Sequence, residues 1–270
     1  MRKLFFLLFA LSTLILTFSL EAQENTLDSM SLNGVTGIYV VPTARIGFPD
    51  DNFGFNGGYH TNIFKPKGGD LKPNHLIQTN FSLFKMVELA GTFDLKPDPL
   101  HHDLLFGVKF QFPFTPIPVA VGSNFQYTGM GDANIWALQF YGAVTYKADL
   151  FGWPADTTLV MGYTFIKDES HSNIDFGVGF DMIIFPEQLR NFLHALIDYA
   201  NFSYSVSPWG ADAWARGVFN TGLRVDLSQI PALNKFTFAV DIFLADAFDS
   251  SNSFGSGRSF GTGVTFGMSF

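Results

Sequence analysis

From Phe53 onward, apolar residues alternate one by one with small or polar residues in segment after segment. A β-strand points successive side chains to opposite faces, so each segment predicts a strand with one apolar face and one polar or nearly bare face. The last segment shows the pattern clearly, with apolar or threonine positions at Phe260, Thr262, Val264, Phe266, Met268 and Phe270. Twelve such segments follow one another, at residues 53–63, 75–84, 86–95, 103–112, 117–129, 135–149, 157–167, 173–185, 194–206, 213–228, 234–248 and 259–270.

The length of these segments indicates where they lie. Strands of globular proteins have about five or six residues, whereas tilted strands of about 9–11 residues cross a bilayer. Turn residues separate the alternating segments, as in transmembrane barrels. The sequence therefore predicts an all-β fold, a transmembrane antiparallel β-barrel of about 12 strands that occupies residues 53–270.

One segment departs from simple alternation. Between Pro186 and Ala200 the apolar residues recur at helical spacing, at Leu189, Phe192, Leu193, Leu196, Ile197 and Ala200. This spacing predicts a short helix that runs into a strand near Ile197. The apolar parity also changes between Asp198 and Phe202, which predicts a β-bulge in the ninth strand.

Composition agrees with a surface that meets lipid. Hydrophobic residues make up 47% of the chain, 33 of them phenylalanine, and only 15% of the residues are charged. Soluble proteins carry about 25% charged residues. The formal net charge of −8 argues against a nucleic-acid partner. The sequence has no cysteine, which excludes disulfides, thiolate metal sites and a lipoprotein anchor.

The first 22 residues have the pattern of a secretory signal peptide. Arg2 and Lys3 precede an apolar run from Leu4 to Leu20, and Ala22 is a small residue at the expected cleavage point. A membrane-anchor helix is the alternative, because about 17 apolar residues approach the length needed to span. The polar residues that follow favour cleavage and export.

The C-terminal strand carries a second indication of destination. Its residues Val264, Phe266, Met268 and Phe270 resemble the sorting strand of bacterial outer-membrane β-barrels, which ends on an aromatic residue. That resemblance implies the outer membrane of a diderm bacterium. It also implies two partners, outer-membrane lipid and the barrel-assembly machinery.

The sequence predicts that residues 23–52 form a periplasmic segment ahead of the barrel, and this segment contains a distinct motif. Two glycines are followed by a short apolar run and a Pro-Thr-Ala-Arg sequence, at Gly34, Gly37, Pro42, Thr43, Ala44 and Arg45. This motif resembles the opening of the YjbH-type outer-membrane proteins, a family linked to exopolysaccharide biosynthesis and secretion. The resemblance implies a narrow channel or an accessory to exopolysaccharide export, with a polysaccharide or small solutes as partners. A non-conducting structural or adhesive barrel is the alternative.

Two interpretations of this segment remain open. It is either an ordinary lead-in to the first strand or a plug, with Arg45 paired to an acid in the lumen. Glycine permits backbone conformations closed to other residues, and Pro42 lacks a backbone donor. The apolar run between them, Ile38 to Val41, is compatible with a short strand or with a segment in the barrel mouth.

If the apolar faces meet lipid, the opposite faces line the lumen and hold its charges, because charged side chains on the lipid face are costly. This reasoning predicts eleven lumen charges, at Glu88, Asp94, Asp103, Lys109, Lys147, Asp175, Asp181, Arg216, Arg224, Asp226 and Asp241. They form either a structural ion-pair network or a lining that selects solutes. Acids outnumber bases in this set, which predicts a weak preference for cations.

One motif of the sequence bears on whether the protein is an enzyme. Outer-membrane phospholipases are similar in length and carry His-x-Ser-Asn, whereas this chain has the adjacent residues His171, Ser172 and Asn173. Adjacent strand residues point to opposite faces, so His171 cannot activate Ser172 as a base. The other histidines show no metal-ligand spacing. We therefore predict no enzymatic activity, no cofactor and no metal site.

Overall fold

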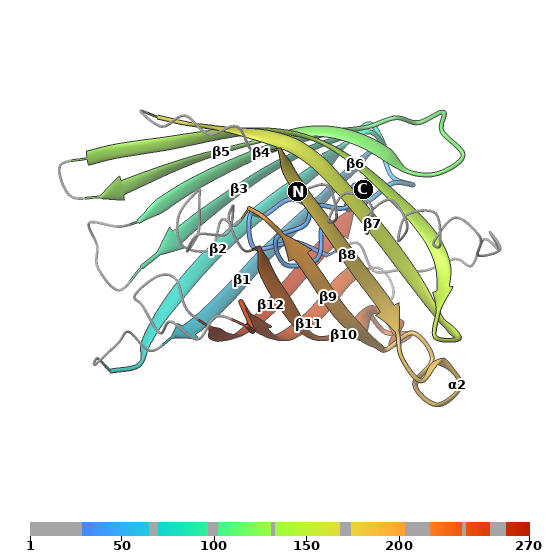
Figure 1. The fold of residues 1–270 in the computed structure, drawn as a ribbon. Coiled ribbons are helices and arrows are strands. Elements are labelled where there is room, and N and C mark those ends of the chain that lie inside the picture. Colours follow the sequence, from blue (N-terminus) through green and yellow to red (C-terminus); the bar gives the residue numbers. More distant parts are fainter. Residues whose placement is uncertain are drawn as a thin grey trace, which may run out of the picture.

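Twelve strands close into an antiparallel barrel in a computed structural model of the chain, which describes residues 29–64, 70–96, 102–130, 133–167, 174–202, 217–233, 236–248 and 258–270 (Figure 1). Each strand pairs with its neighbours in chain order, and β12 pairs with β1. All twelve predicted strands are confirmed. Their bounds are β1 Phe53–Phe64, β2 Lys72–Leu83, β3 Val87–Leu95, β4 Asp103–Gln111, β5 Val119–Met130, β6 Ala133–Leu150, β7 Trp153–Ile166, β8 Asp175–Ile183, β9 Leu193–Ala200, β10 Val218–Asp226, β11 Phe236–Ala245 and β12 Ser259–Ser269.

Closure removes the exposed edges that an open sheet would have. The ladder between β1 and β12 is continuous from Gly54–Ser269 to Phe64–Ser259, so both terminal strands are paired on both sides. We call the end of the barrel where Phe53 begins β1 and Phe270 follows β12 the terminal rim, and the other end the opposite rim. Residues 1–28, including the predicted signal peptide, lie outside the described residues.

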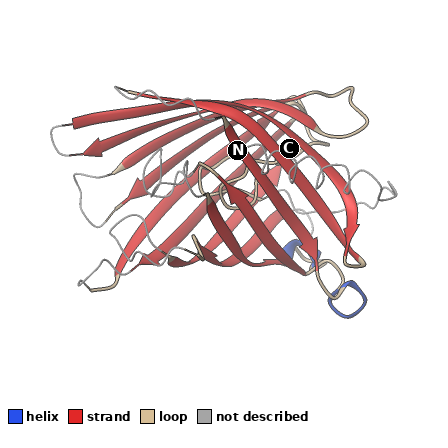
Figure 2. Cartoon of the chain, in the orientation of Figure 1, coloured by secondary structure: helices blue, strands red, loops and turns tan. Residues whose placement is uncertain are grey.

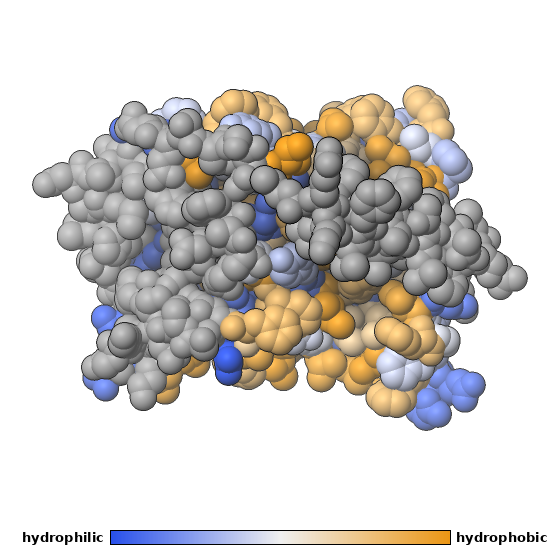
Figure 3. Space-filling model, viewed as in Figure 1, coloured by the Kyte–Doolittle hydropathy of each residue, from blue (hydrophilic) through white to orange (hydrophobic). Residues whose placement is uncertain are grey.

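Alternation along the strands separates an apolar outer face from a polar inner one. On β4, Phe106 and Val108 point outward and are half exposed. The next residue of the same strand, Lys109, points inward and is fully buried. Apolar side chains gather on the visible outer surface of the described strands in Figure 3. The predicted assignment of faces is therefore correct, and it follows from the two-residue period of the strand.

The turn between β6 and β7, at the terminal rim, is short. β6 and β7 are joined by Phe151 and Gly152 alone, both with positive φ (55° and 82°). Two left-handed residues match the twist of a tight hairpin. For this reason β7 begins at Trp153, four residues before the predicted start at 157, and the predicted turn at 150–156 is largely strand.

The connection between β8 and β9 contains the short helix α2, Pro186–Leu189, one of few helical elements in Figure 2. A short helix before the ninth strand is thus confirmed, but the strand begins at Leu193. The predicted bulge is wrong, because β9 keeps an unbroken register with both β8 and β10. The change in apolar parity has another cause: Phe202 is buried and packs in an interior cluster with Val41. Within the described residues, no helix is long and apolar enough to cross a membrane.

Candidate functional site: the plugged lumen

Residues 29–47 lie inside the barrel and fill part of its lumen; we call them the plug. Every one of them is buried except Thr43, which is half-buried. Figure 1 shows this segment in blue, coiled between the strands. Of the two interpretations of the N-terminal motif, the structure adopts the one in which the segment enters the barrel.

The plug folds back on itself through its own backbone. The Gly34 N–H donates to the Ser31 carbonyl at 2.9 Å, and the Thr43 N–H donates to the Thr36 carbonyl at 3.1 Å. Gly37 and Pro42 face each other in an isolated bridge. Gly34 has φ +89°, and a Cβ there would lie 2.6 Å from the Thr92 hydroxyl oxygen. The motif glycine is therefore required both by its backbone conformation and by its close approach to β3.

Asp198 on β9 is one of the anchors of the plug. Its Oδ2 atom accepts the backbone N–H groups of Tyr39, Val40 and Val41 at 2.9, 2.7 and 3.2 Å. Its Oδ1 atom accepts a hydrogen bond from the Asn220 amide at 2.6 Å. Three successive N–H groups that converge on one oxygen form a backbone nest for an anion. The Asp198 carboxylate of the barrel wall thus accepts hydrogen bonds from three backbone N–H groups of the plug that are not paired in a β-ladder.

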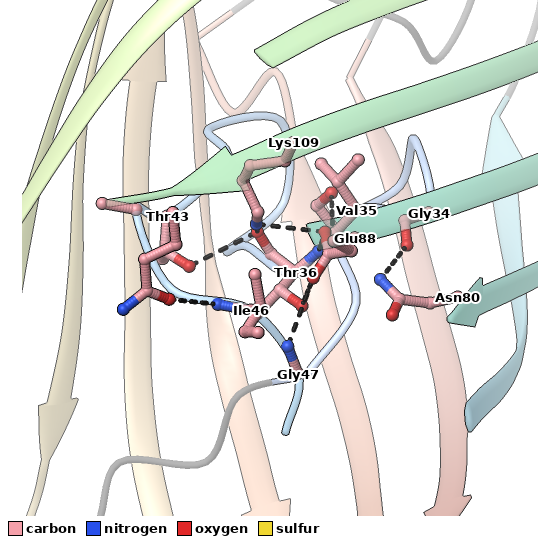
Figure 4. Close-up of polar contacts among 12 residues, drawn as sticks. Gly34, Val35, Thr36, Thr43, Ile46, Gly47, Asn80, Glu88 and Lys109 are labelled. Atoms are coloured by element: carbon pink, nitrogen blue, oxygen red, sulfur yellow. Dashed lines mark hydrogen bonds and ion pairs between the residues drawn. The ribbon is translucent and has the colours of Figure 1, made fainter. Parts of the chain in front are cut away.

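Glu88 on β3 forms a second anchor, shown in Figure 4. Its carboxylate accepts the Thr36 N–H at 2.8 Å, the Thr36 hydroxyl, and the Gly47 N–H at 3.2 Å. Lys109 lies 3.1 Å from the same carboxylate and donates to the Thr36 carbonyl at 2.9 Å. Opposite charges on adjacent strands therefore hold one turn of the plug between them.

The Pro-Thr-Ala-Arg end of the motif is held by β6 and β7. The Ala44 N–H donates to the Thr145 hydroxyl at 2.8 Å. The Arg45 Nη2 atom lies 2.9 and 2.8 Å from the two carboxylate oxygens of Asp156, and both side chains are largely buried. A buried guanidinium is costly unless it is paired, so Asp156 makes this position of Arg45 possible. Arg45 does pair with an interior acid, as the plug interpretation predicts.

Glycines of the barrel wall receive the apolar side chains of the plug. A Cβ added at Gly179 would lie 2.4 Å from Ile38 Cδ1, and one added at Gly107 would lie 2.4 Å from Val35 Cγ1. Gly58 is approached in the same way by Met30. The inward-facing glycines of the strands therefore leave space that the apolar side chains of the plug occupy.

Tyr39 of the plug is buried in the interior, and its phenol group is neutral there. Its ring packs against Phe243, with centroids 4.8 Å apart. Burial, and then the nearby charge of Asp241, hold the pKa of the Tyr39 phenol well above its ordinary value of 10.0. The phenol therefore stays neutral, and the plug contributes one charge to the lumen, that of Arg45.

Most of the predicted lumen charges lie in the interior. Lys147 is half-buried at the end of β6, directly opposite Asp156, and Arg216 lies outside the described residues. Arg224 pairs with Asp241 through two hydrogen bonds of 2.7 and 3.0 Å. The other buried members of the predicted set are Glu88, Asp94, Asp103, Lys109, Asp175, Asp181 and Asp226.

Two acids that bind the plug are absent from the predicted set of lumen charges. They are Asp156, which pairs with Arg45, and Asp198, which accepts the N–H groups of the backbone nest. The sequence pattern places Asp156 in a turn, whereas the hairpin at Phe151 and Gly152 is shorter than that pattern predicts and Asp156 lies on β7. The sequence pattern predicts no face for Asp198, because the helical spacing of the apolar residues obscures the register of β9. The alternation His194, Leu196, Asp198, Ala200 is the signal that could have revealed it, since all four point inward.

The motif compared with phospholipases, His171 to Asn173, lies outside the described residues. In the part of the chain that the structure describes, no three His, Cys, Asp or Glu side chains are grouped as metal ligands.

A closed barrel with an apolar outer face and a charged, occupied interior defines a transmembrane antiparallel β-barrel of twelve strands. Neither protein-family models nor curated proteins match the chain. Among solved structures, it is similar to the Acinetobacter baumannii outer membrane protein Omp33, with 9% identity and a TM-score of 0.46 over 82% of this chain and 98% of that one. It is also similar to the KdgM porin solved in complex with disordered oligogalacturonate, with 9% identity and a TM-score of 0.43 over 80% and 99%. The class of this protein rests on its own strand pairing and surface.

Proposed function

We propose that the protein is an outer-membrane channel of a diderm bacterium, closed by its own N-terminal plug and acting in exopolysaccharide export. The main support for a closed channel is the burial of residues 29–47 against inward-facing side chains of β3, β7 and β9. A barrel of twelve strands lies between the filled eight-stranded barrels and the open porins of 16 or more strands. A folded-back chain in its lumen blocks a path that is otherwise wide enough for small solutes or one extended polymer.

The link to exopolysaccharide is supported by the resemblance of Gly34, Gly37 and Pro42 to Arg45 to the opening of YjbH-type proteins. Each of these residues has a structural task within the plug, in turns, in close approach to the wall or in the ion pair with Asp156. The motif therefore coincides with the segment that closes the channel.

Planar-bilayer recordings test the closed channel. The wild-type protein is expected to show rare openings, because the plug keeps its hydrogen bonds to the wall. A plug-free variant lacking residues 29–47 is expected to show a steady conductance, since the barrel ladders do not involve these residues.

The same recordings distinguish the second candidate, a non-conducting structural barrel. The dense bonding of the plug to several strands favours it, because a plug that is part of the scaffold needs no release. A plug-free barrel that is folded, as judged by heat-modifiable migration on a gel, but passes no current would exclude the channel.

The C-terminal strand carries a separate prediction about assembly. Phe270 is largely exposed, packs against Phe53 with centroids 5.9 Å apart, and donates its N–H to the Phe53 carbonyl at 2.8 Å. Deleting Phe270 is expected to lower the amount of folded barrel in the outer membrane of cells several-fold, because the assembly machinery is proposed to read this residue. Ile230→Ala, at an exposed apolar turn position of the same rim, is the control and should assemble normally. Equal assembly of both variants would refute the role of Phe270.

A further inference from the structure

The interior of the barrel carries a large excess of negative charge. Among the buried Asp, Glu, Lys and Arg side chains that the structure describes, ten are acids and four are bases. One of these four bases, Arg45, belongs to the plug. When the plug leaves, the described wall keeps all ten acids and loses one of its partners.

The plug itself shows what these acids bind. Glu88, Asp156 and Asp198 stand on three different strands, and each receives donors from the plug: N–H groups, a hydroxyl and a guanidinium. Buried carboxylates without donors are strongly unfavourable. Whatever occupies the open lumen must therefore supply hydrogen-bond donors or positive charge at these three places.

A second set of acceptors lies beyond the plug, towards the opposite rim. Asp94 is two residues further along β3 than Thr92, which faces Gly34 of the plug, and it stands directly opposite Asp103 on β4. Both are fully buried, and both oxygens of Asp94 and the Oδ1 atom of Asp103 accept no hydrogen bond in the described structure. Lys96 reaches the pair, at 3.9 and 2.6 Å from their Oδ2 atoms, and supplies one positive charge for two carboxylates.

Neutral acceptors continue this row around the wall. Asn62 on β1 stands directly opposite Asn74 on β2, both point inward, and their Oδ1 atoms accept no hydrogen bond from the described residues. With Asp94 and Asp103 they form a band of oxygen atoms on four consecutive strands. The oxygen atoms of this band that accept no hydrogen bond can each accept one from a donor-rich ligand.

We infer that the open lumen binds a linear polysaccharide that carries ammonium groups. This inference rests on the proposed function, because the path exists only if residues 29–47 can leave the barrel. Ammonium groups pair with the carboxylates at the plug level, and ammonium groups and sugar hydroxyls donate to the free oxygen atoms of the band formed by Asn62, Asn74, Asp94 and Asp103. An anionic polymer meets an excess of like charge on the wall, ten acids against three bases, and is disfavoured.

Current block of the plug-free barrel tests the inference, with an oligomer of glucosamine as the probe at mildly acidic pH. The N-acetylated oligomer of the same length is the matched control, because it has the same sugar backbone with each ammonium group replaced by a neutral acetamide. Glucosamine oligomer is expected to block the current at a concentration at least tenfold lower than its N-acetylated form. Glu88→Gln, Asp156→Asn and Asp198→Asn are each expected to raise the half-blocking concentration about tenfold, since a hydrogen bond to a charged group is worth at least that factor.

Equal block by the two oligomers, or block unchanged in all three variants, would overturn the inference while leaving the channel intact. A plug-free barrel that conducts nothing would overturn the proposed function instead. In that case calorimetric titration of the detergent-solubilised plug-free barrel with the two oligomers still decides the inference, and equal affinities would reject it. If the deletion prevents folding, the Asp198→Ala variant of the full chain replaces it, with Glu88 and Asp156 as the acids that remain to be substituted.

Discussion

Replacing Asp198 by alanine is expected to release the plug while the barrel stays folded. The substitution removes the oxygen atom that accepts three backbone N–H groups, from Tyr39 to Val41. A buried polar group left without a partner costs about 1–3 kcal/mol, so the plug loses roughly 3 kcal/mol or more of its binding free energy. Because the native sequence has no cysteine, a Val41→Cys substitution supplies a unique reporter at a fully buried position. Maleimide labelling of this reporter is expected to be roughly 100-fold faster in the Asp198→Ala background.

Asp175→Ala is the matched control for this experiment. Asp175 is also a buried acid of the wall, but its donors are Gln139 and Thr164, which belong to β6 and β7. Its removal disturbs the barrel interior without touching the plug, and labelling should stay near the wild-type rate. If both variants label equally fast, the nest at Asp198 does not hold the plug.

Replacing Phe140 by arginine is expected to destabilise the whole barrel. Phe140 lies in the middle of β6, on the outer face, and its ring is half exposed beside that of Phe165 at a centroid distance of 6.3 Å. An arginine on the lipid face near the bilayer midplane costs about 2–4 kcal/mol. Urea titrations of folding into lipid vesicles, followed by tryptophan fluorescence, measure the change in free energy of unfolding.

Phe114→Arg is the control for the lipid-facing position. Phe114 is 96% exposed in the connection between β4 and β5 at the terminal rim, outside the strands. A charge there remains close to water and should change the free energy of unfolding little. A loss at Phe114 as large as that at Phe140 would contradict the assignment of the outer face to the hydrocarbon layer.

Much of the candidate site could be predicted from local patterns. Inward-facing Glu88, Lys109 and Asp241 follow from alternation alone, because a strand needs no tertiary information to place its side chains on one face or the other. Their partners do not follow from it. Glu88 binds Thr36, which lies 52 positions away in the sequence, and nothing in the sequence around either residue indicates the other.

Asp156 and Asp198 show where local pattern reasoning fails. Each lies next to an irregular connection, a two-residue hairpin and a helix-to-strand transition, where the face of a residue depends on where the strand begins. A shift of one residue moves every side chain to the other face. Only the paired neighbours fix that register, and they come from other parts of the chain.

By itself, the sequence determined the twelve strands, the apolar outer face and the charged interior, because the two-residue period of a strand is a local property that the lipid surroundings make strict. The tertiary structure alone decided that Gly34 to Arg45 enter the lumen, that the bare glycine faces receive Ile38 and Val35, and that Asp156 and Asp198 hold the plug. These contacts join residues far apart in the sequence, and they are determined by shape and by the need of buried polar groups for partners once the barrel has closed.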